Sequence, residues 1–376
     1  MGSPAPGRVP KQSRLYTLRG MDEVGVGLVG FGLAGQVFHG PLIAATPGLR
    51  LRAIATSDPE RRRAAASRFP GARLAADLPE LLGSASDLQL LVLASPNRHH
   101  LPQALAGLEA GLHLVVDKPL ALSSSEAATM ILAARQRGLR LAVFHNRRWD
   151  DDFLLLRQVM DSGRLGRIRR LESRFERWRP ELSPGSWREV EAPESGGGLL
   201  LDLGSHLIDQ ALTLGGAPEL VYAEIRSRRG AAGDDDSFVS LTFPDGLLVH
   251  LWVSAVAAVP GPRFLAVGTG GGLSTSGLDP QEAQLRGGAS PLDRGFGQRS
   301  GADQWALLGE EGGPQRLAFP PGRYLDFYSQ MWRAVVEGGE VPVPGEDGLR
   351  TLEVVEAARE SARRRQVVKL APSRSS

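Results

Sequence analysis

Three side chains that suit acid–base chemistry stand out in this sequence, and they come from two distant segments. Lys118 follows an apolar run within Asp117-Lys118-Pro119 and is the one lysine away from the chain ends. Asp202 and His206 are four positions apart, which places them on one face if their segment is helical. An imidazole beside a carboxylate is suited to proton transfer. Because Pro119 restricts the backbone at Lys118, we expect the ammonium to be aimed consistently.

Asp209, three positions after His206, is a second carboxylate on the same expected face. We expect Asp202 and Asp209 to flank His206, to orient its ring and to raise its pKa toward a value useful for proton transfer. Each feature also has a structural interpretation. Lys118 can be a surface side chain at a strand end, and the histidine and its carboxylates can form a packing contact.

A glycine-rich turn predicts a dinucleotide cofactor. Gly30-Phe31-Gly32-Leu33-Ala34-Gly35 matches the pattern G-x-G-x-x-G between an expected strand and an expected helix. In that setting the glycines allow a tight turn, close approach of a pyrophosphate and packing of the helix on the strand. The helix start adds free N–H groups and a positive dipole end. The alternative is a turn that requires positive φ angles and binds nothing.

The end of the second expected strand bears on the choice of cofactor. A carboxylate there would grip the ribose 2′-hydroxyl of NAD, but the strand ends at Thr56 and Ser57. Asp58 follows one or two positions late, and Arg61 begins a run of three arginines that could bind a 2′-phosphate. We expect NADP(H) to be favoured and NAD(H) to be possible. Alternatively, Asp58 starts a turn and the arginines form a solvated helix face.

The elements that must position these residues fall into two groups. Apolar strands alternate with helices up to Phe144, which is typical of a doubly wound parallel sheet in a Rossmann domain. The expected strands are 24–29, 51–56, 88–94, 112–116 and 139–144, and the expected helices are 34–45, 59–68, 99–110 and 125–137. Beyond these come helices 151–160 and 199–214 and strands 168–178, 220–226, 238–243 and 247–256. Hairpin signals among these strands favour a large, mostly antiparallel open sheet in a C-terminal α/β domain.

The expected domains are a flexible tail at 1–20, a dinucleotide-binding domain at 21–145 and a substrate-binding and oligomerisation domain at 146–376. Met21 is a candidate natural start. The helix at the C-terminus can pack back on the Rossmann domain.

Composition excludes several classes of function. The 44 basic and 42 acidic side chains leave a formal charge of +2, too small a surplus to indicate nucleic-acid or membrane binding. The absence of cysteine excludes disulfides, thiolate metal sites and a cysteine nucleophile. The longest apolar stretch, 247–259, is too short for a membrane span, and the first twenty residues hold no apolar segment typical of a secretory signal. We expect a cytoplasmic protein with a small-molecule substrate and no metal.

Further polar and aromatic residues lie near the expected site. Ser95, Pro96, Asn97 and His100 can line the cofactor cleft, or they can cap a helix. The domain junction carries Asn146, Arg147, Arg148 and Trp149, which can contact a polyol together with Trp187 in a loop; the alternatives are an interdomain clasp and an aromatic that ties down the loop. Asp234 to Asp236 are typical of a solvated loop.

Together these motifs resemble the Gfo/Idh/MocA family of glucose-fructose and inositol dehydrogenases. The resemblance rests on Gly30 to Gly35, Pro96-Asn97 with His100, Asp117-Lys118-Pro119 and Gly197-Gly198 leading to Asp202, His206 and Asp209. Asp117 replaces the family's usual glutamate, a variant found in the branch with NADP-dependent scyllo-inositol dehydrogenases. Phe144 to Trp149 and Gly277 to Glu282 are also similar to that branch.

The resemblance implies oxidation of a secondary alcohol of a sugar, inositol or related polyol by NAD(P). His206 would be the acid/base, Lys118 would stabilise the alkoxide and Asp202 would orient the substrate or the imidazole, with Asp117 and Lys118 also beside the cofactor. It further implies a homodimer or homotetramer through the C-terminal sheet. A catalytically silent dinucleotide-binding sensor, or a reductase of non-sugar carbonyls or dihydrodiols, remains an alternative.

Overall fold

The computed structural model describes residues 23–183 and 187–370. The tail predicted at 1–20, together with Met21, lies outside the described residues. No helix within these two ranges is long and apolar enough to cross a membrane.

The N-terminal half forms a six-stranded parallel sheet in the order β3-β2-β1-β4-β5-β6. Its strands are β1 (Val24–Val29), β2 (Leu49–Ala55), β3 (Arg73–Ala75), β4 (Leu90–Leu93), β5 (His113–Val116) and β6 (Leu141–Val143). The surrounding helices are η1 (Gly35–His39, a π-helix), α1 (Gly40–Ala45), α2 (Pro59–Arg68), α3 (Leu78–Gly83), η2 (Asn97–His99), α4 (His100–Glu109) and α5 (Ser124–Gln136). The central strands β1 and β4 are buried along their whole length, as their unbroken apolar sequence requires.

This half confirms the predicted doubly wound sheet. The five expected strands are present, with ends within two residues of those expected. The sequence pattern missed β3 and α3, which are too short to show a period.

The second half forms a nine-stranded sheet in the order β14-β13-β12-β11-β7-β10-β9-β8-β15. These strands are β7 (Ile168–Glu176), β8 (Leu220–Arg226), β9 (Asp236–Thr242), β10 (Leu248–Ser254), β11 (Phe264–Gly268), β12 (Gly272–Thr275), β13 (Trp305–Glu310), β14 (Gly313–Ala318) and β15 (Val368–Lys369). Only the β7–β10 pair among them is parallel, so the predicted, mostly antiparallel sheet is confirmed.

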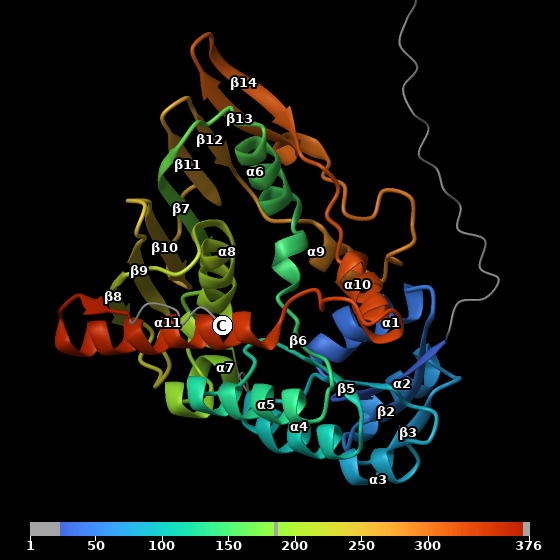
Figure 1. The fold of residues 1–376 in the computed structure, drawn as a ribbon. Coiled ribbons are helices and arrows are strands. Elements are labelled where there is room, and N and C mark those ends of the chain that lie inside the picture. Colours follow the sequence, from blue (N-terminus) through green and yellow to red (C-terminus); the bar gives the residue numbers. More distant parts are fainter. Residues whose placement is uncertain (1–22, 184–186, 371–376) are drawn as a thin grey trace, which may run out of the picture.

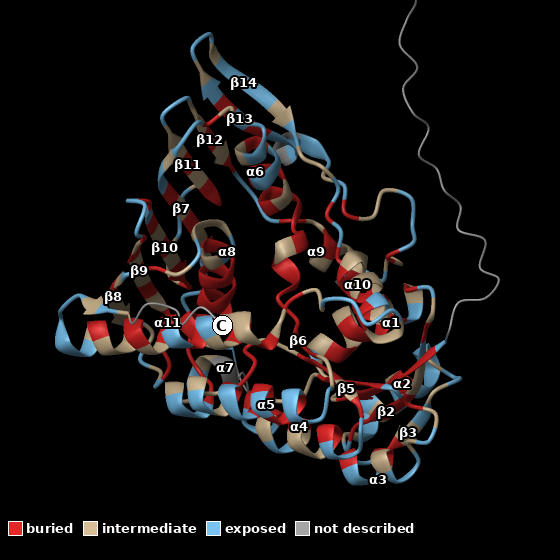
Figure 2. Ribbon diagram, viewed as in Figure 1, coloured by how far each residue is buried: buried red, intermediate tan, exposed pale blue. Residues whose placement is uncertain are grey.

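Helices connect the two sheets and cover one face of the second. They are η3 (Asn146–Trp149), α6 (Asp151–Asp161), α7 (Trp187–Val190), η4 (Pro193–Ser195), η5 (Leu200–Gly204, a π-helix), α8 (Ser205–Gly215), α9 (Gln281–Arg286), η6 (Gly301–Gln304), α10 (Leu325–Val336) and α11 (Gly345–Arg364). Helix α8 is buried along most of its length at the centre of the molecule (Figure 2).

The long helix α11 ties the two halves together. It runs across the molecule between α5 of the Rossmann half and β8 of the second sheet (Figure 1), and it packs on both. Ser124 binds Glu356 of α11 through both its backbone N–H and its hydroxyl, each at 2.7 Å. The two sheets are thereby held around the space between them, where the carboxyl end of β5 faces η5.

Candidate active site

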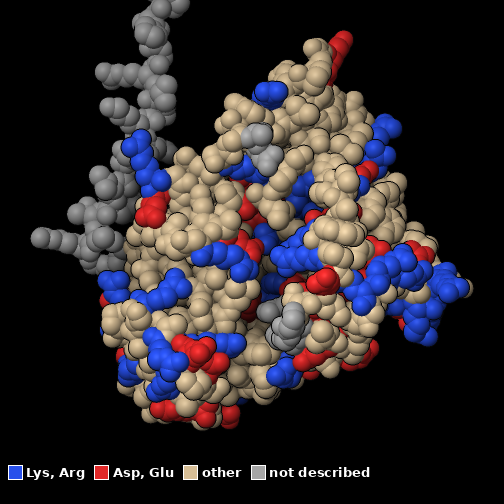
Figure 3. Space-filling model, turned by 180° about the vertical axis from the view of Figure 1, so that it is seen from behind, with Lys and Arg blue, Asp and Glu red and all other residues tan. Residues whose placement is uncertain are grey.

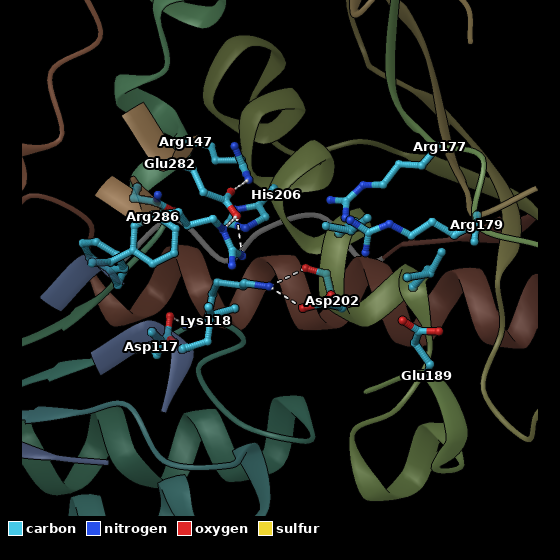
Figure 4. A pocket seen from close by; sticks show the side chains of 18 of the residues that line it. Asp117, Lys118, Arg147, Arg177, Arg179, Glu189, Asp202, His206, Glu282 and Arg286 are labelled. Atoms are coloured by element: carbon cyan, nitrogen blue, oxygen red, sulfur yellow. Dashed lines mark hydrogen bonds and ion pairs between the residues drawn. The ribbon is translucent and has the colours of Figure 1, made fainter. Parts of the chain in front are cut away.

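A cavity of about 520 Å³ lies between the two sheets. It brings together residues from the glycine turn, the end of β5 and the η5–α8 segment: Leu33, Ala34, Asp117, Lys118, Asp202 and His206. Figure 4 shows these segments converging, and Figure 3 shows basic side chains around a hollow in the back face of the molecule. The edge formed by the carboxyl ends of parallel strands is where this fold holds its ligands. The three side chains predicted for catalysis therefore share one cavity.

Lys118 and Asp202 are joined directly. The ammonium donates to Asp202 Oδ1 at 2.7 Å and to the backbone oxygen of Asp202 at 2.5 Å. Their side chains are 16% and 21% exposed, so the pair is accessible to a ligand and partly screened from solvent. This contact holds the ammonium against η5, and His206 follows in the first turn of α8.

His206 is 4% exposed, and its environment lowers its pKa well below the ordinary value. Burial is the main cause, and the positive charges of Lys118 and Arg147 add to it. Nδ1 is buried without a hydrogen-bond partner among the described residues, which leaves Nε2 as the nitrogen open to the cavity. The imidazole is therefore neutral at neutral pH and can accept a proton through Nε2.

Two expectations about His206 are wrong. Its pKa is lowered rather than raised, because burial and nearby cations outweigh any carboxylate. Asp209 does not serve the imidazole, because both its oxygens accept from Arg148, at 2.6 and 2.8 Å. Since η5 is a π-helix, the face that carries Asp202 is turned relative to a regular α-helix, and Asp202 meets Lys118.

The lowered pKa of His206 leads to a prediction about pH. A base must be deprotonated to act, and a lowered pKa keeps it deprotonated into more acidic solution. If His206 is the base of the reaction, we expect kcat/KM, measured at saturating cofactor, to stay constant down to about pH 6.5 and to fall only at lower pH. A decline that begins above about pH 7 would contradict the assignment of His206 as a neutral base.

The glycine turn has the geometry that a pyrophosphate requires. Gly30 has φ of 94°, and a Cβ there would lie 2.5 Å from the Ala94 carbonyl oxygen. A Cβ on Gly35 would lie 2.2 Å from the Gly30 oxygen, so this glycine permits helix η1 to pack on the turn. Phe31 points into the core, edge-on to Phe69. A side chain at Gly32 would meet nothing closer than Arg61, at 3.6 Å. The open space above Gly32 therefore fits a bound dinucleotide, with Arg61 beside it.

The carboxylate that follows β2 caps a helix. Thr56 is buried, and Asp58 accepts from the backbone N–H groups of Glu60 and Arg61 at 2.9 and 3.0 Å. Asp58 thus caps helix α2, and these backbone bonds lower its pKa. Ser57 is exposed beside this cap.

The residues after β4 lie near this cleft, but His100 does not line it. Its Nδ1 lies 3.0 Å from the Pro119 oxygen and its Nε2 3.0 Å from the Ser95 oxygen. Since the ring is fully buried and both nitrogens are occupied, His100 holds the loops after β4 and β5 together. Pro96 precedes the η2 turn, and Asn97 is buried beside Gly196. Our expectation that His100 contacts the cofactor is corrected accordingly.

Neither Arg148 nor Trp149 lines the cavity. Arg148 binds Asp209 and also Asp347 of α11, at 2.9 Å, and Trp149 is a core residue whose ring meets Phe327 at 5.7 Å. These contacts join η3 to α8, α10 and α11 within the second half of the chain, so both residues have a structural function. The side chain of Trp187 lies outside the described residues.

Their neighbour Arg147, which belongs to the same predicted group, does line the cavity. This side chain donates to Glu282 of α9 at 2.8 Å and to Asp150 at 3.2 Å. Glu282 lies inside the segment 277–282 but was not predicted as a site residue.

Asp234 and Asp235 are buried rather than solvated. Asp234 accepts from the backbone N–H of Leu200 at 2.8 Å, and Asp235 pairs with Arg229 at 3.0 Å. The first of these contacts secures the start of η5, the segment that carries Asp202.

Two family models match the chain in succession. The oxidoreductase family with an NAD-binding Rossmann fold matches residues 24–145, and the GFO/IDH/MocA C-terminal domain matches residues 153–274. The two family matches, together with a cavity that joins the glycine turn to Lys118, identify the class of this protein as an NAD(P)-dependent oxidoreductase. The chain belongs to the Gfo/Idh/MocA family.

Relatives match nearly the whole chain. It is 37% identical to oxidoreductase YdgJ of Escherichia coli (93% of this chain, 99% of the relative). It is 33% identical to the NADP(+)-dependent scyllo-inositol 2-dehydrogenase IolW of Bacillus subtilis (94% and 97%). An oxidoreductase structure from Bacillus cereus superposes with a TM-score of 0.82 at 28% identity, covering 93% of this chain and 99% of that one.

Proposed function

We propose that this protein is an NADP(H)-dependent dehydrogenase that oxidises a secondary hydroxyl of a sugar, inositol or related polyol. The observation that carries the proposal is the placement of Lys118, bound to Asp202, in one cavity with His206 and with the turn residues Leu33 and Ala34. The names of the similar inositol dehydrogenases support a polyol substrate.

The side chains supply distinct functions. Lys118 would donate a hydrogen bond to the reacting hydroxyl and stabilise the negative charge that develops on its oxygen. His206 would take the hydroxyl proton on Nε2, as a neutral imidazole can. Asp202 holds the ammonium in place through the 2.7 Å contact. The cofactor, bound over the Gly30 turn, supplies the redox chemistry by accepting a hydride from the carbinol carbon.

The preference for NADP(H) rests on the end of β2. Asp58 caps α2 through Oδ1, its Oδ2 lies 3.8 Å from Arg61 Nε, and Arg61 borders the space above Gly32. The name of IolW as an NADP(+) enzyme supports the same choice. Comparing NADP⁺ and NAD⁺ reduction with scyllo-inositol, myo-inositol and glucose tests the proposal. Turnover of none of these with either cofactor would count against it.

Arg61→Ala provides the sharper test of cofactor choice. A guanidinium that contacts a phosphate makes charge-assisted hydrogen bonds. We therefore expect loss of the Arg61 guanidinium to raise the Kd for NADPH at least about fivefold and to change the Kd for NADH little. Arg63→Ala, on the same helix and directed to solvent near Glu60, is the matched control. Equal effects of the two variants, or a wild-type protein that binds NADH more tightly than NADPH, would overturn the preference.

A further inference from the structure

The cavity carries a surplus of positive charge. Among its described residues, Lys118, Arg147, Arg177, Arg179, Arg229 and Arg286 are basic, whereas Asp117, Glu189, Asp202 and Glu282 are acidic. Most of the basic groups have a carboxylate partner. Lys118 binds Asp202, Arg229 binds Glu189 and Asp235, and Arg147 and Arg286 share Glu282. The surplus is therefore concentrated on the remaining two arginines.

Arg177 and Arg179 have no carboxylate within ion-pair distance in the part of the chain that the structure describes. Arg177 is the more enclosed of the two, and its Nε is buried without a hydrogen-bond partner among those residues. Burial lowers the pKa of Arg177, and the charges of Arg179 and Arg147 lower it further, whereas the carboxylates of Asp202 and Glu282, beyond ion-pair distance, raise it. Two neighbouring guanidinium groups that face a cavity without a directly paired carboxylate are stabilised when an anion binds between them.

The backbone holds this pair rigidly. The Arg177 N–H donates to the Ser254 oxygen at 2.9 Å, and the Arg179 N–H donates to the Ala255 oxygen at 2.7 Å. Because the segment is extended, residues two apart share a face, and Trp178 between them points away and is 58% exposed. Figure 4 shows both arginine side chains running side by side toward the cavity that Lys118 and Asp202 line.

We propose that Arg177 and Arg179 form an anion subsite, so that the natural substrate is a polyol bearing a carboxylate or a phosphate ester. The anionic group would bind the two guanidinium groups while the reacting hydroxyl meets Lys118. Planar guanidinium groups suit both anions, because their N–H groups match pairs of oxygens. This inference rests on the proposed function and specifies the substrate class for the same site.

The test is equilibrium binding to protein saturated with NADP⁺, so that the cofactor's own phosphates already occupy their site. The ligands are D-glucose, D-glucuronate and D-glucose 6-phosphate, which share a pyranose ring and differ in charge. We expect at least one of the two anions to bind ten times or more tightly than glucose, with affinity that falls as salt is added. The anion that binds more tightly indicates whether the natural substrate carries a carboxylate or a phosphate ester.

Arg177→Gln and Arg179→Gln should each reduce the ratio of anion to glucose affinity by at least about tenfold. Arg169→Gln is the matched control, because it makes the same change on an exposed position of the neighbouring strand β7, outside the cavity. Equal affinity for all three ligands, no measurable anion binding, or the same loss in Arg169→Gln would each overturn the subsite. Anion binding that depends on Arg177 but leads to no NADP⁺ reduction with any polyol would contradict the proposed dehydrogenase activity and not the subsite.

Discussion

Replacing Lys118 with alanine is expected to lower the turnover number for polyol oxidation by at least about 10²-fold. The substitution removes the ammonium that stabilises charge on the reacting oxygen, and it leaves the carboxylate of Asp202 without this partner in the cavity. The measurement is steady-state NADP⁺ reduction. NADPH binding, followed by fluorescence titration, should change little, because Gly30 and Arg61 are untouched.

A second readout separates chemistry from folding for Lys118→Ala. A small primary amine added to the buffer fits the space of the missing side chain and should restore part of the turnover in proportion to its concentration. Turnover near the wild-type level in Lys118→Ala without added amine would remove Lys118 from the mechanism.

Replacing His206 with alanine is expected to have an effect of similar size, at least about 10²-fold on turnover, because no other group in our scheme accepts the hydroxyl proton. The acid limb of the kcat/KM profile, which we assign to this imidazole, should also disappear. Loss of packing alone would leave the shape of the pH profile unchanged.

His250→Ala is the matched control, since it removes a partly exposed histidine from strand β10 outside the cavity. We expect its turnover and pH profile to match those of the wild type. Equal losses in His250→Ala and His206→Ala, or an acid limb that persists without His206, would show that this imidazole is not the base.

The features predicted correctly from the sequence are those set by local pattern. The turn at Gly30 to Gly35 has glycines where its φ angles and close contacts require them. The parallel sheet was predicted correctly from the alternation of apolar strands and helices, because this alternation can be read from residues that are neighbours along the chain. Lys118 could be placed because a residue that follows a parallel strand must lie at the carboxyl edge of the sheet.

The features predicted wrongly depend on which segments meet in space. Arg148 was assigned to substrate, but the fold brings Asp209 and Asp347 to it, so Arg147 next to it faces the cavity instead. The pKa of His206 follows from its burial and from cations on other elements. A local pattern shows neither the π-helical geometry of η5 nor the partner that a charged side chain will find.

The most direct test of hydride transfer uses scyllo-inositol deuterated at its ring carbons, incubated with NADP⁺ and the wild-type protein. Mass spectrometry of the recovered NADPH then reports whether hydrogen moved from substrate carbon to nicotinamide. We predict one deuterium per NADPH formed, and at least about 10²-fold slower appearance of that product with Lys118→Ala. NADPH that forms without deuterium, or no NADPH with the labelled or unlabelled polyol, would contradict the proposal.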